Sequence, residues 1–95
     1  MYPLAQTIYS IEYDSELSCE KALEFVKNNE DQINLFYKSF GGKIMGYGID
    51  EKEKKHLFFR SEQQMLSTVY TKMYFEKFLK DFGVKKVEVF LLDAK

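Results

Sequence analysis

The stretch over residues 64–82 carries the pattern that most constrains how this chain can fold. Its apolar residues follow the helical period of about 100° per residue, but they change sides halfway along. The earlier group points in one direction and comprises Met65, Leu66, Val69, Tyr70 and Met73. The later group points in the opposite direction and comprises Tyr74, Phe75, Phe78, Leu79 and Phe82. One straight helix cannot bury both groups against a single sheet.

The later group contains three Phe residues that need a cover. Burying a Phe side chain is worth about 1.5–3 kcal/mol, so leaving this face in water would expose a large apolar patch. The cover is a second copy of the chain, a partner protein, or the rest of this chain if the helix kinks near Tyr74. We predict an interface with another chain at Tyr74, Phe75, Phe78, Leu79 and Phe82.

Four segments alternate apolar and polar residues as strands do, at residues 6–13, 43–50, 56–61 and 84–92. Ser15 or Ser18 is a suitable cap for a helix that follows the first strand. Ser61 and Gln64 have capping-box spacing for the later helix, and Gly83 ends that helix.

Residues 32–40 fit two patterns. Ile33, Phe36, Tyr37 and Phe40 recur at helical spacing, whereas Ile33, Leu35 and Tyr37 alternate as in a strand. We favour the helix for this segment.

The resulting order is β-α-β-β-α-β, which is the ferredoxin-like arrangement of an α+β domain. It predicts a four-stranded antiparallel sheet with its helices on one face. If residues 32–40 form an extra strand instead, the order becomes β-α-β-β-β-α-β. The length of 95 residues fits a single domain over residues 1–95.

The other sheet face is open in this fold, and we expect function there. Ile8, Phe58 and Phe90 would add apolar interface area on that face. Gly46 and Gly48 share the same face, which indicates that something approaches the backbone closely.

His56 and Arg60 are the only His and the only Arg of the chain, and they share this open face. With Glu12 on the neighbouring strand, they form a candidate contact for an anion or another ligand. No residue is assigned a catalytic role, and Cys19 is interpreted as a buried thiol. The pattern predicts neither a metal site nor a cofactor.

Charge is unevenly distributed although the net charge is only −1. Residues 1–31 hold seven acids and two bases, a balance of −5, whereas residues 32–95 hold twelve bases and eight acids, a balance of +4. An acidic part can pair with a basic part of a second copy. The overall net charge of −1 disfavours nucleic acid as a partner. No segment has the length to span a membrane, and the single cysteine indicates a cytoplasmic protein.

Three functions fit these patterns. The preferred one is a small non-enzymatic regulator or inhibitor that forms a homodimer or binds a partner protein through residues 64–82 or the open sheet face. The second is a compact ferredoxin-like nucleic-acid binder or nuclease. The third is a dimeric α+β enzyme or sensor of small molecules, in which His56, Arg60 and Glu12 line a pocket.

Overall fold

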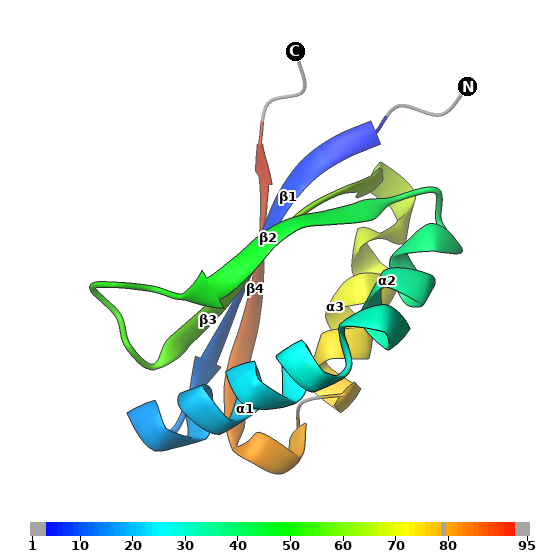
Figure 1. The fold of residues 1–95 in the computed structure, drawn as a ribbon. Helices are drawn as coiled ribbons and strands as arrows, with labels where there is room; N and C mark the ends of the chain where they lie inside the picture. Colours follow the sequence, from blue (N-terminus) through cyan, green and yellow to red (C-terminus); the bar gives the residue numbers. More distant parts are fainter. Residues whose placement is uncertain (1–3, 79, 93–95) are drawn as a thin grey trace.

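The computed structural model describes residues 4–78 and 80–92, with Leu66 and Phe78 described by their backbone alone. One antiparallel sheet has the order β2-β3-β1-β4 and consists of β1 (Leu4–Tyr13), β2 (Lys43–Ile49), β3 (His56–Gln64) and β4 (Val84–Leu92). One face of this sheet is covered by α1 (Glu16–Asn28), α2 (Glu30–Lys38) and α3 (Thr68–Phe78), as Figure 1 shows. The predicted α+β class is therefore confirmed, and the sheet order is compatible with the ferredoxin-like arrangement.

Residues 32–40 contribute to a helix, so the alternative of an extra strand is wrong. Within α2, Ile33 and Tyr37 are fully buried one turn apart, whereas Leu35 between them is 67% exposed. This burial follows the helical period rather than the strand period. Asn29 separates α2 from α1, since its side-chain nitrogen donates a hydrogen bond to the Phe25 carbonyl at 2.8 Å.

The core lies between the sheet and the helices. On β1 every second residue from Ala5 to Tyr13 is buried, and on β3 the same holds from Leu57 to Gln63. Phe75 of α3 packs on this surface, where its ring stacks on Phe59 at a centroid distance of 4.4 Å. The side-chain alternation of the sequence therefore identified the covered face of both central strands.

The expected helix over residues 64–82 is wrong as one continuous element. β3 extends to Gln64, and a 3₁₀ turn, η1 (Met65–Ser67), precedes α3. A second 3₁₀ turn, η2 (Lys80–Phe82), follows, and Gly83 then adopts a φ of +77° as expected for a helix-ending glycine.

The extension of β3 has a physical cause in a buried polar network. The Tyr9 hydroxyl donates to Oε1 of Gln63 at 2.6 Å, and Nε2 of Gln63 donates to Oγ1 of Thr71 at 2.8 Å and to Oγ of Ser67. These bonds hold Gln63 in the sheet with its amide satisfied. Ser61 therefore belongs to β3, where its hydroxyl lies 2.8 Å from that of Thr7, and it does not cap a helix.

The sheet has two distinct ends. At one end Gln6 of β1 pairs with Leu92 of β4, so that β1 begins where β4 finishes. At the other end Glu12 pairs with His56, beside the turn that joins β2 to β3. In Figure 1 the start of β1 and the end of β4 lie together at the first of these two ends.

Candidate functional site

The uncovered face of the sheet carries the residues that the sequence placed there. Paired residues of neighbouring antiparallel strands direct their side chains to the same face. The registers align three rows across the strands: Gly46, Arg60, Ile8 and Phe90; Gly48, Phe58, Ser10 and Glu88; and His56, Glu12 and Lys86. The candidate ligand contacts and three of the predicted interface residues are thus brought together, and their roles remain predictions.

The two glycines of β2 differ in what surrounds them. A Cβ at Gly48 would lie 3.7 Å from Cζ of Phe58, which is an ordinary van der Waals contact with that ring. A Cβ at Gly46 would meet nothing within 4 Å, which leaves bare backbone beside Arg60. No described part of this chain approaches Gly46 closely, so an approaching ligand stays a prediction.

His56 lies at the end of the open face near the β2–β3 turn. Its Nδ1 atom is 3.2 Å from the Ser10 hydroxyl, and Glu12 is its cross-strand neighbour. A hollow of about 390 Å³ adjoins it and is lined by Glu12, Glu16, Lys52, Glu53, Lys54, Lys55 and His56. The lining mixes three acidic side chains with three lysines, so the hollow has no charge of one sign to select a ligand.

Cys19 is fully buried at the start of α1. Burial, assisted by the neighbouring Glu20 carboxylate, raises the pKa of its thiol to about 11. A thiol with such a pKa is a poor nucleophile at neutral pH, which agrees with the interpretation as a structural thiol. In the part of the chain that the structure describes, no three His, Cys, Asp or Glu residues group closely enough to hold a metal ion.

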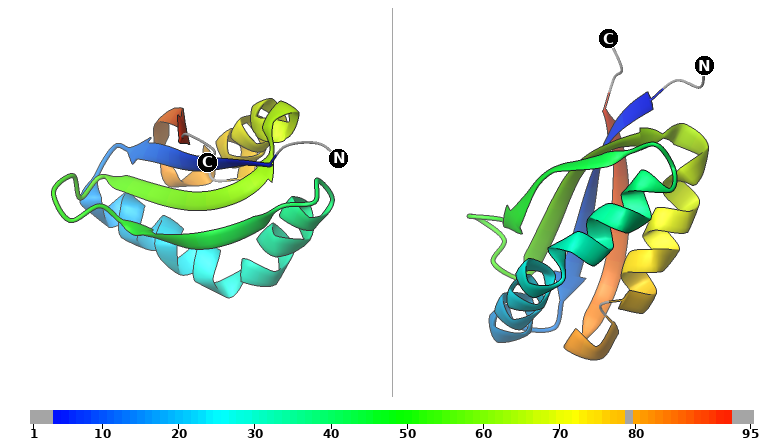
Figure 2. Two further views of the ribbon diagram at one scale, coloured as in Figure 1. Left: turned by 90° about the horizontal axis from the view of Figure 1, so that it is seen from above. Right: turned by 45° about the vertical axis from the view of Figure 1, so that its right-hand side comes forward.

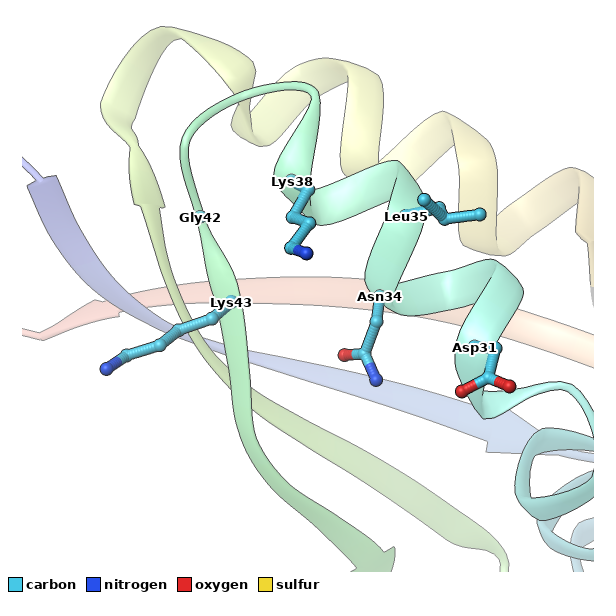
Figure 3. A pocket seen from close by; sticks show the side chains of 6 residues that line it. All are labelled: Asp31, Asn34, Leu35, Lys38, Gly42 and Lys43. Carbon is cyan, nitrogen blue, oxygen red and sulfur yellow. The ribbon is translucent and has the colours of Figure 1, made fainter.

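A second hollow, of about 460 Å³, lies between α2 and the start of β2 (Figure 3). In Figure 3, Asp31, Asn34 and Lys38 come from α2, whereas the Lys43 side chain extends away from that helix. The charged groups do not converge on one point, and we assign no ligand to this hollow.

The predicted helix interface requires a correction. Phe75 is fully buried in the core of its own chain, so it cannot contact a partner. Tyr74 and Phe82 are half-buried against the same core. Tyr74 stacks on Phe36 at a centroid distance of 4.0 Å, and the Phe82 ring lies tilted against Phe25 at 5.2 Å. Leu79 and the side chain of Phe78 lie outside the described residues. Tyr74, Phe75 and Phe82 are therefore covered by the rest of their own chain, as expected if no partner is needed there.

The opposite side of α3 is left in solvent. Met65 is 48% exposed, Val69 63%, Tyr70 61% and Met73 59%. Leu35 of the neighbouring helix α2 is 67% exposed. We call these five residues the outer helix patch. Large apolar side chains gathered on one surface in this way are typical of protein-binding sites.

Comparison of this chain with protein-family models, with curated proteins and with solved structures found no match. Among the helices within residues 4–78 and 80–92, none combines the length and the apolar character that crossing a bilayer requires.

Sequence reasoning missed the outer helix patch because it assigned the two faces of the helix the wrong way round. The core side of α3 is partly polar, since Thr71 is fully buried and Ser67 is 4% exposed. Their hydrogen bonds to Gln63 make this burial favourable. The three polar residues recur every four positions, and that spacing was the available signal for a buried polar stripe.

Proposed function

We propose that this chain is a small non-enzymatic binding protein, of the regulator or inhibitor type, that acts by docking on another protein chain through the outer helix patch. The observation that carries this proposal is the exposure of Val69, Tyr70 and Met73 on one side of α3. The proposal keeps the cytoplasmic location that the single cysteine indicates.

The packing of this region favours a preformed docking surface. Tyr74 stacks on Phe36 and Tyr70 stacks on Phe40, so aromatic contacts fix α3 against α2. Thr71 and Phe75 anchor the inner side of α3 in the core. The exposed residues of α3 are therefore presented on a rigid element, which lowers the entropy cost of binding.

Site-specific photocrosslinking tests this proposal in the cells that make the protein. We expect a photoreactive amino acid at Val69 to form covalent adducts with another protein chain. Leu17 on α1 is the matched control position, since it is 59% exposed but lies outside the outer helix patch. Equal adduct yields at the two positions, or none at either, would contradict the proposal.

A second candidate, small-molecule sensing or catalysis at the open sheet face, is favoured by one observation. The registers gather the only His and the only Arg around Phe58 on that face. Titration with inorganic phosphate, followed through the NMR signals of His56 and Arg60, tests this candidate. Saturable shifts that disappear in Arg60→Gln would support it, and unchanged signals would exclude phosphate as its ligand class.

A further inference from the structure

We infer that the partner of the outer helix patch is a second copy of this chain, bound around a two-fold axis with α2 of each copy lying over α3 of the other. This inference rests on the proposed function, because it names the partner of the same surface. Three observations support it: the helix geometry, the apolar residues and the end charges.

The two helices are antiparallel neighbours on the side of the molecule that faces away from the sheet (Figures 1 and 2). Two ring contacts fix the position of each helix along the common axis direction, which we call its height. Phe36 stacks on Tyr74 at a centroid distance of 4.0 Å, and Phe40 stacks on Tyr70 at 6.2 Å. At about 1.5 Å of rise per residue, Leu35 and Met73 then differ in height by about 3 Å.

This arrangement has a consequence for a symmetric dimer. A two-fold axis that runs parallel to the helices and between them exchanges α2 and α3 without changing their height. The most exposed apolar residue of α2, Leu35, then meets the partner's Met73, and the reverse contact follows from symmetry. Apolar side chains face each other at both places, and the long Met73 side chain can span the height difference of about 3 Å.

The charges at the helix ends complement each other in the same arrangement. The first turn of α2 carries Glu30 and Asp31, and the last turn of α3 carries Lys77. Because the helices are antiparallel, the acidic and basic turns lie at one end of the pair. The two-fold axis places Asp31 over the partner's Lys77. Among the described residues the ion pair that forms joins Lys86 to Glu88, so it involves neither Asp31 nor Lys77.

The area of the contact between the two helix pairs sets the expected affinity of the dimer. Helices of 9 and 11 residues are about 14–16 Å long, and with neighbouring axes about 10 Å apart they give a footprint of roughly 300–400 Å². A tight complex buries about 800 Å² on each partner. We therefore expect a weak, concentration-dependent dimer with a dissociation constant on the order of micromolar rather than nanomolar.

Sedimentation equilibrium of the purified full chain, from micromolar to millimolar concentration, tests the inference. We expect a reversible monomer–dimer equilibrium, and Met73→Glu should raise its dissociation constant at least about tenfold, because a carboxylate would be desolvated at the interface. Leu17→Glu introduces the same charge at an exposed apolar site on α1, outside the outer helix patch, and it should leave the constant unchanged.

A charge reversal tests the orientation. An exposed ion pair changes a dissociation constant by about two- to fivefold, so Asp31→Lys and Lys77→Glu should each weaken the dimer by that factor. The double variant restores the opposite charges and should recover wild-type association. A double variant as weak as the two single variants combined would overturn the arrangement.

The remaining outcomes separate this inference from the proposed function. A wild-type chain that stays monomeric at millimolar concentration overturns the inference, as does a dimer that Met73→Glu leaves intact. If Val69 then still crosslinks to a different protein in cells, the proposed function stands with another partner. If Val69 forms no adduct with any chain, both proposals fail.

Discussion

At the scale of single residues, the two sides of α3 show how burial depends on what the facing surface offers. Phe75 stacks on Phe59 and lies edge-on to Tyr9, whereas Met73 two positions earlier is 59% exposed. Thr71, one turn before Phe75, is buried because Gln63 provides a hydrogen-bond partner. The core side of this helix therefore includes the polar Thr71 beside Phe75, whereas the apolar Met73 faces the solvent.

Substitution by alanine should separate these two sides. We expect Phe75→Ala to lower the free energy of unfolding by about 3–5 kcal/mol, because it leaves a cavity under the sheet. Met73→Ala should change that free energy by no more than about 0.5 kcal/mol. Urea denaturation of both variants measures the difference, and similar losses would contradict the burial of Phe75.

The sequence predicted the faces of the strands better than those of α3, for a physical reason. A strand side chain can face only one of two ways, so a period of two placed Ile8, Phe58 and Arg60 correctly on the open face. In α3 two apolar groups compete, and only the partners on the sheet decide between them. Those partners include Gln63, which hydropathy alone would have placed in solvent.

At the scale of elements, glycines mark where the chain comes close to itself. A Cβ at Gly42, between α2 and β2, would lie 2.5 Å from the Glu62 carbonyl oxygen and 2.8 Å from Cβ of Gln63. A Cβ at Gly46, four residues later in β2, would meet nothing within 4 Å. Within the chain, the tight backbone contact is therefore at Gly42, and a ligand at Gly46 and Gly48 stays a prediction.

The pair Gly42→Ala and Gly46→Ala provides a matched test. We expect Gly42→Ala to destabilise the fold by about 1–3 kcal/mol, since the backbone of β3 would have to move. Gly46→Ala should be neutral or stabilise by up to about 1 kcal/mol, because alanine is favoured over glycine within a strand. Thermal unfolding of both variants measures the effect, and a larger loss at Gly46 would refute this assignment.

Helical elements were predictable where their burial repeats once per turn. Ile33 and Tyr37 identified α2 despite the competing alternation in the same residues. The boundary between β3 and α3 was not predictable, because Ser61 and Gln64 have the spacing of a helix start. The side-chain bonds of Ser61 to Thr7 and of Gln63 to Tyr9 cross 54 positions of the chain, and no local pattern reveals them.

At the scale of the whole molecule, the core holds several groups that resist losing a proton. Burial raises the pKa of Tyr13 and Tyr37 far above the usual value, and it raises the pKa of Cys19 to about 11. The Tyr13 hydroxyl is buried and has no hydrogen-bond partner among the described residues. The folded chain therefore keeps protons that the unfolded chain releases at lower pH.

This difference predicts alkaline destabilisation. Stability should be unaffected while all three groups are protonated in both states, and it should fall as pH rises above about 9, where the unfolded chain begins to lose protons. Tyr13→Phe should reduce this loss, and at neutral pH it should stabilise the fold by about 1 kcal/mol by removing an unpaired hydroxyl. Urea denaturation between pH 7 and 11 provides the measurement, and a stability that rises over this range would contradict the assignment.

The candidate site was only partly predictable at this scale. The open sheet face followed from the order of helices and strands, so the sequence alone predicted that Glu12, His56 and Arg60 lie on one face. The outer helix patch depends on how α2 and α3 pack, through contacts such as Phe36 with Tyr74. Contacts between two helices depend on tertiary packing, so they cannot be predicted from the hydropathy of either segment.

The pairing of Gln6 with Leu92 at one rim of the sheet makes this chain suitable for circular permutation. A short linker can connect the outer ends of β1 and β4, and new termini can open in the charged turn between Asp50 and Lys55, at the far rim. Such a rearranged gene would keep every helix and strand while reversing which of them the ribosome makes first. Reporter proteins fused to the new termini would then lie at the far rim of the sheet.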